Sequence, residues 1–156
     1  MRFLIILRHK VQNYCAMNRR EQRLFWRAAF ELTRFNLRLR YVRFAELLKT
    51  ERLVPSQESP STLSAGHSEI CRAIRIAVAR AARALPFANR CLVRSLAEMS
   101  MLNSEHLAAE LCIGFRRNSL GRTAGHAWVN YADHTNASAL SFSIAARYRQ
   151  ESTRPG

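Results

Sequence analysis

The spacing of hydrophobic residues predicts an amphipathic helix in the first third of the chain. Between residues 18 and 52, apolar side chains recur at steps of three and four, the period of a helix with one buried face. This stripe consists of Leu24, Ala28, Leu32, Phe35, Leu39 and Val42. Asn18 followed by Glu21 has the form of a capping box, so we expect the helix to begin there. Because residues 35–41 also alternate, a break into two helices or a short strand is an open alternative.

A second amphipathic helix is predicted after a loop. Residues 55–66 are rich in proline and serine, a composition typical of a connection. Over residues 67–85 a helical stripe then recurs, and Pro86 stops it. The stripe consists of Ile70, Ile74, Val78, Ala81 and Leu85, and we place Arg72, Arg75, Arg80 and Arg83 on the solvent-exposed face.

A third helix and a set of strands complete the pattern. Asn89 is the predicted N-cap of a helix that carries Cys91 in its first turn and buries Leu92, Leu96 and Met99. Alternating residues then predict strands around 111–115, 127–131 and 140–144, with a hairpin at 132–135 that joins the last two. Helices followed by antiparallel strands predict an α+β fold, with the Cys-bearing helix packed on a small antiparallel sheet.

Length and charge narrow the class of protein. The 156 residues suit one compact domain. We divide them into a basic helical segment with its loop (1–66), a core (67–150) and a tail (151–156). The net charge is +14, and residues 1–54 hold 13 basic and four acidic side chains. Such a charge favours nucleic acid, anionic lipid or acidic peptide. The sequence shows no helix-turn-helix, zinc or aromatic-rich RNA motif, so nucleic-acid binding is an alternative rather than our first interpretation.

The cysteines and the N-terminus indicate a cellular compartment. Cys15, Cys71, Cys91 and Cys112 form no CxxC pair and no metal-ligand spacing, so we expect no metal, no cofactor and free thiols. The apolar run at residues 3–7 is too short for a signal peptide or a membrane span. We therefore expect a cytoplasmic protein. Residues 1–17 lack a periodic pattern, and Met17 is a second candidate for the start of translation.

One cysteine and one histidine are the candidates for chemistry. Cys91 lies at a predicted helix start, where unpaired backbone N–H groups favour a thiolate and are available to an oxyanion. His126 lies in a predicted strand and is a candidate general base and acid. A helix-borne cysteine followed by a strand-borne histidine is typical of papain-like and transglutaminase-like chemistry. Taken alone, each residue also fits a structural role in the core.

Three blocks of sequence carry a resemblance to a known family. They are residues 91–96 (CLVRSL), 111–115 (LCIGF) and 125–129 (GHAWV). In order and spacing they resemble the transglutaminase-like leader peptidase of lasso-peptide biosynthesis, the B protein in its stand-alone form. The resemblance implies a transglutaminase-like or papain-like core with Cys91 as nucleophile and His126 as base. It implies a cysteine protease that removes the leader from a ribosomally made precursor before macrolactam formation.

The resemblance also implies partners. They are the precursor peptide, a separate leader-recognition protein and an asparagine-synthetase-like cyclase. The recognition protein is expected to be separate because residues 1–66 show no counterpart of the family's winged-helix-like module. A catalytically inactive scaffold for the cyclase is a further alternative.

Two positions depart from the family pattern. His106 stands where the family usually carries a turn glycine, and residues 136–138 lack the acidic residue that usually follows the histidine. Asp133, the only aspartate in the chain, is then a candidate to orient His126. The neutral candidates are Asn136, Ser138 and Ser141, of which Ser141 is expected opposite His126 across the predicted hairpin.

Overall fold

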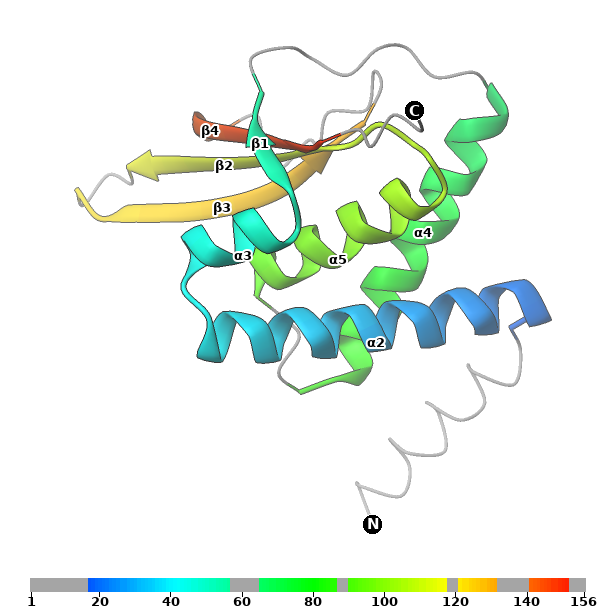
Figure 1. Ribbon diagram of the computed structural model, residues 1–156. Helices are drawn as coiled ribbons and strands as arrows, with labels where there is room; N and C mark the ends of the chain where they lie inside the picture. Colours follow the sequence, from blue (N-terminus) through cyan, green and yellow to red (C-terminus); the bar gives the residue numbers. More distant parts are fainter. Residues whose placement is uncertain (1–16, 57–64, 87–89, 118–120, 132–140, 152–156) are drawn as a thin grey trace.

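The computed structural model describes residues 17–56, 65–86, 90–117, 121–131 and 141–151. The elements in chain order are α2 (Arg19–Tyr41), α3 (Phe44–Thr50), β1 (Leu53–Pro55), α4 (Ala65–Ala84), α5 (Cys91–Ser104), β2 (Glu110–Arg117), β3 (Thr123–Asn130) and β4 (Ser143–Gln150). Helices precede most of the sheet, which confirms the predicted α+β class (Figure 1).

The first helix begins and ends for local reasons. The Asn18 side chain accepts a hydrogen bond from the backbone of Glu21, and the Glu21 carboxylate accepts one from the backbone of Asn18. This reciprocal pair confirms the predicted capping box. Extended backbone at Val42 and Arg43 then separates α2 from α3. The alternating stretch 35–41 is therefore helical, and the apolar pattern is split into two helices only after it, at residues 42–43.

The sheet differs from the predicted arrangement. Its order is β1-β4-β2-β3 with antiparallel pairs, so β2 lies between β3 and β4. The predicted hairpin between the last two strands is therefore wrong in its pairing, and β4 begins only at Ser143. Opposite His126 lies Gly114, and Ser141 instead accepts a hydrogen bond from Arg116. The physical reason is that β2 uses both of its edges, which a local alternation of residues does not reveal.

Strand β1 was not predicted. It spans three residues and pairs with the far end of β4, Leu53 opposite Gln150. Three residues are too few to show a period of two, so only the pairing defines the strand. The pairing joins the segment before residue 66 to the last strand of the sheet.

The hydrophobic core surrounds α5, which lies between the sheet and α2 (Figure 1). One buried cluster includes Ala28, Leu32 and Phe35 of α2, Ile74 and Val78 of α4, Leu96, Met99 and Leu102 of α5, and Leu111 and Val129 of the sheet. The core is thus shared by residues on both sides of position 66. A smaller cluster, Cys112 and Trp128 with Phe142 beside it, covers the opposite face of the sheet.

Truncating Phe35 tests the importance of α2 for this core. The side chain is 1% exposed, so Phe35→Ala should lower the free energy of unfolding by about 3–5 kcal/mol through lost burial and a cavity. Tyr41→Ala is the matched control on the same helix, because Tyr41 is 77% exposed and should cost far less. Urea unfolding monitored by circular dichroism measures both. Equal losses would show that α2 does not contribute to the cooperative core.

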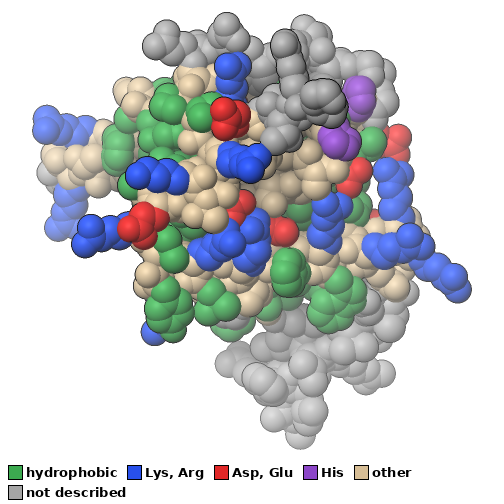
Figure 2. Space-filling view, viewed as in Figure 1, with side chains coloured by type: hydrophobic (Ala, Val, Ile, Leu, Met, Phe, Trp, Pro, Cys, Tyr) green, Lys and Arg blue, Asp and Glu red, His purple; other side chains and the backbone are tan. Residues whose placement is uncertain are grey.

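Basic side chains are spread over the face seen in Figure 2, and exposed hydrophobic side chains gather along its lower edge, over α2. Several arginines of α2 form ion pairs rather than a free cationic surface. These pairs are Arg27 with Glu105, Arg34 with Glu31 and Glu51, and Arg38 with Glu51.

Within the described residues, no helix has the length and apolar character needed to cross a membrane.

Candidate active site

Cys91 is the first residue of α5. The N-cap is Arg90, which corrects the predicted cap at Asn89, a residue outside the described ranges. The Arg90 side chain makes no capping hydrogen bond, so it does not occupy the amide donors of the first turn. The Cys91 side chain is partly exposed, whereas Cys71 and Cys112 are fully buried. Among these three thiols, Cys91 is therefore the accessible one.

His126 lies on β3 among aromatic rings. Its ring stacks on Trp128 with centroids 5.8 Å apart and lies 5.0 Å from the ring of Phe142. Partial burial lowers the pKa of His126, and the positive charge of Arg94 lowers it further. The imidazole is therefore held in its neutral form at neutral pH, as a general base requires.

Cys91 and His126 both line one pocket. Its volume is about 290 Å³, and its walls come from α4, α5 and β3. The lining residues are Arg75, Val78, Ala79, Cys91, Arg94, Ser95, Glu98 and residues 126–129. Among the described contacts, no hydrogen bond joins the thiol of Cys91 to the imidazole of His126. Apo sites of this kind commonly tighten only when substrate binds.

The pocket follows the free edge of the sheet. In the described part of the sheet β3 pairs only with β2, so its other edge is open. Four consecutive residues of this strand, 126–129, line the pocket, although alternate side chains point to opposite faces. An open strand edge offers backbone donors and acceptors to an extended peptide. Cys91 and this edge therefore border the same space.

The third member of the predicted site is not placed. Asp133, Asn136 and Ser138 lie outside the described residues, and Ser141 is not opposite His126. In the described part of the chain, the neighbours of the His126 ring are the rings of Trp128 and Phe142. The other departure from the family pattern has a clear structural expression, since His106 adopts a positive φ of 58°. This is a conformation that glycine adopts without strain, which explains why a glycine is expected there.

Sequence reasoning missed Glu98 and misplaced Arg75. Glu98 lies two turns after Cys91 on the same face of α5, and its spacing of seven residues was the available signal. Burial raises the pKa of Glu98 to about 7, against the opposing charges of Arg75 and Arg94. Arg75 was predicted on the solvent-exposed face of its helix, but it lines the pocket and hydrogen-bonds Tyr131.

Glu98 should make stability depend on pH. In the folded state its pKa is about 7, above the usual value of 4.5, so the folded protein binds more protons between these values. Stability therefore falls as the pH rises from about 4.5 to 7, by up to about 3 kcal/mol. Glu98→Gln should remove this fall, so the variant gains stability relative to the wild type over that range. Urea titrations from pH 5 to 8 measure the difference, and parallel curves would contradict the assignment.

Gly114 allows the aromatic cluster beside His126 to form. A Cβ atom at this position would lie 2.7 Å from the backbone oxygen of Ser143 and 2.8 Å from the ring of Trp128. The pairing of β2 with β4 is also irregular between Ile113 and Gly114. Gly114→Val should displace the Trp128 ring and lower stability by about 1–3 kcal/mol. Tryptophan fluorescence and thermal unfolding check this. Gly121→Ala is the control for the fluorescence, because no atom lies within 4 Å of an added Cβ there, although its positive φ costs some stability.

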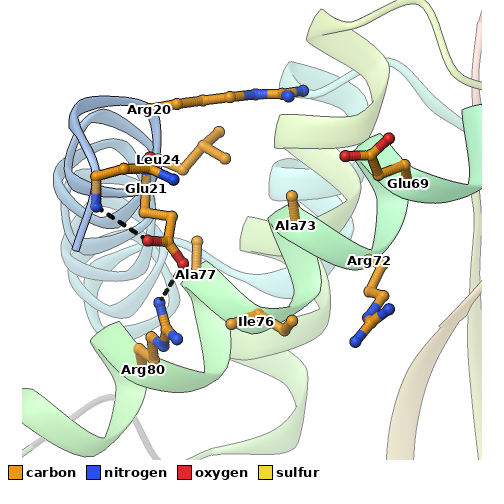
Figure 3. Close-up of a pocket in the computed structure, with 10 residues that line it drawn as sticks. Arg20, Glu21, Leu24, Glu69, Arg72, Ala73, Ile76, Ala77 and Arg80 are labelled. Carbon is orange, nitrogen blue, oxygen red and sulfur yellow. Dashed lines mark hydrogen bonds and ion pairs between the residues drawn. The ribbon is translucent and has the colours of Figure 1, made fainter. Parts of the chain in front are cut away.

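A second groove lacks these reactive groups. It has a volume of about 270 Å³ and lies between α2 and α4 (Figure 3). Leu24, Ala73 and Ile76 provide apolar surface, and Glu21 accepts a hydrogen bond from Arg80 at 3.0 Å. No cysteine or histidine lines it.

Within the described residues, no three His, Cys, Asp or Glu side chains group closely enough to hold a metal ion.

The fold and the pocket are of the kind found in transglutaminase-like and papain-like proteins, with a cysteine at a helix start and a histidine on a strand. The family model of the transglutaminase-like superfamily matches residues 29–147, most of the chain. The protein therefore belongs to the transglutaminase-like superfamily, which commonly contains cysteine proteases. No curated protein and no solved structure matches the chain significantly.

Proposed function

We propose that this protein is a cysteine peptidase that removes the leader from a ribosomally made lasso-peptide precursor before macrolactam formation. The observation that carries the peptidase proposal is that Cys91 and His126 line one pocket at the start of α5 and the edge of β3. The three sequence blocks at residues 91–96, 111–115 and 125–129 support the finer assignment to leader removal.

The proposed chemistry uses the groups that line the pocket and the first turn of α5. The neutral imidazole of His126 accepts the thiol proton as the sulfur of Cys91 attacks the peptide carbonyl. Backbone N–H groups of the first turn of α5 stabilise the resulting oxyanion. The imidazolium then protonates the departing amine, and a thioester remains. Water, deprotonated by the same imidazole, hydrolyses the thioester and releases the leader with a free carboxylate.

The proposal is tested by incubating the protein with its precursor, a separate recognition protein and an asparagine-synthetase-like cyclase. Mass spectrometry should show the leader and a core peptide with a new N-terminal amine, or the macrolactam made from it. Omitting this protein should leave the precursor intact. Leader release without it would remove the assignment.

A nucleic-acid-binding role is the second candidate, because the net charge is +14. Such binding should weaken steeply as salt rises, since released counterions dominate the affinity. The ion pairs of Arg27, Arg34 and Arg38 weigh against this role, because carboxylates of the same chain neutralise part of the positive charge. Absence of retention on DNA or RNA at low salt would dismiss this candidate. An inactive scaffold is distinguished by a Cys91 thiol that does not react with alkylating agents.

A further inference from the structure

The pocket beyond Cys91 is lined by an unusual set of charges. Arg94 and Glu98 follow Cys91 on one face of α5, and Arg75 faces them from α4. Glu98 lies about 10 Å from Cys91 along the helix axis, within reach of a substrate residue beside the reacting bond. Because two guanidinium groups face one carboxyl group, the pocket wall is positive whether Glu98 is ionised or neutral.

Ser95 adds a hydrogen-bonding group to the same wall. The residue is only 4% exposed, and it lines the pocket one turn after Cys91. Arg75 is held by its hydrogen bond with Tyr131. The wall thus combines a cation held in place with a hydroxyl group that can donate or accept a hydrogen bond.

We propose that this wall binds a carboxylate of the peptide substrate through Arg75 and Arg94, and that Glu98 is the specificity-determining residue that sets how tightly the carboxylate is held. The inference rests on the proposed function, since it concerns the substrate of the Cys91 site. The carboxylate comes either from an acidic side chain or from a chain terminus. Ionised Glu98 repels it, whereas neutral Glu98 donates a hydrogen bond to it.

The protonation of Glu98 then controls the preference near neutral pH. Burial raises its pKa to about 7, and Arg75 and Arg94 oppose the rise. The other groups that face it are Cys71 from α4 and Tyr131 after β3, whose pKa values are both raised, so both stay neutral. His126 lines the same pocket, and its lowered pKa keeps most of it neutral above pH 6.5. Of Glu98, Cys71, Tyr131 and His126, Glu98 is therefore the group whose charge changes most between pH 6.5 and 8.5.

Three alkylating probes test the inference on the full chain. They are N-iodoacetyl derivatives of aspartic acid α-amide, of asparagine with a free carboxylate, and of asparagine amide. The first two differ only in where the carboxylate lies, and the third is neutral. The rate at Cys91 is measured by mass spectrometry of the fragment that contains it. Ratios of rates at one pH cancel the ionisation of the thiol.

At pH 6.5 at least one acidic probe should react about three- to tenfold faster than the neutral probe, and the ratio should fall at pH 8.5. The faster acidic probe identifies the source of the carboxylate. Glu98→Gln should keep the high ratio at both pH values, and Arg94→Gln should reduce it toward one. Glu105→Gln, a charge change at the far end of α5, is the control and should leave the ratio as in the wild type.

The possible failures are distinguishable. Equal rates for all three probes at a reactive Cys91 would overturn the carboxylate site and leave the peptidase proposal standing. A Cys91 that reacts with none of the probes would overturn the peptidase proposal and this inference with it. If Glu98→Gln does not fold, the pH dependence of the wild-type ratio decides, and a ratio that does not fall at pH 8.5 overturns the role of Glu98.

Discussion

Replacing Cys91 by alanine should reduce leader release by on the order of 10³-fold or more, because the variant has no sulfur to form the thioester. The side chain is partly exposed at the first residue of α5, so its removal should leave the fold intact. Single-turnover cleavage followed by mass spectrometry measures the loss. Circular dichroism and thermal unfolding confirm that the variant remains folded.

Cys112→Ala is the matched control for Cys91→Ala. Cys112 is buried on the opposite face of the sheet, and burial together with the nearby Glu110 carboxylate raises the pKa of its thiol to about 12. Such a thiol is inert at neutral pH, so cleavage should continue in this variant. Cleavage that persists in Cys91→Ala would refute the proposed nucleophile.

Replacing His126 by asparagine should lower the rate of cleavage by about 10²–10⁴-fold, because the proton of the thiol and that of the departing amine lose their carrier. Asparagine retains a polar side chain of moderate size beside Trp128, so the aromatic cluster should be disturbed little. The rate constant for acylation, measured with excess enzyme, reports the loss directly.

The same substitution at His106 provides the control. His106 adopts a positive φ, which asparagine tolerates better than most residues, and it does not line the pocket. His106→Asn should therefore cleave at close to the wild-type rate. A His126→Asn variant as active as His106→Asn would show that His126 is not the proton carrier.

The candidate site was predictable to the extent that local sequence positions each residue. The helix start at Cys91 and the strand around His126 follow from periodicity, and the structure places both beside one pocket. Glu98 could have been predicted from its spacing of seven residues from Cys91 on α5. Arg75 was not, because nothing along α4 distinguishes an arginine that faces the pocket from one that faces solvent. Its hydrogen bond with Tyr131 forms only when distant segments meet.

The strand order shows the same limit. An alternating pattern predicts that a strand forms and which of its faces is buried, and β2 and β3 were found in this way. The pairing partner depends on which edge a later strand reaches. Because β4 pairs with β2 and β1, the outer edge of β3 has no partner strand among the described residues, and the pocket runs along that edge.

The sequence by itself determined the helices, the α+β class and the two residues proposed for chemistry, because these depend on local periodicity, capping and helix-start geometry. Only the tertiary structure decided that β2 lies between β3 and β4 and that Glu98 and Arg75 line the same pocket as Cys91 and His126. It also decided that the outer edge of β3 is open in the described part of the sheet. Those features depend on contacts between residues far apart in the chain, and the free energy of such contacts leaves no periodic trace in the sequence.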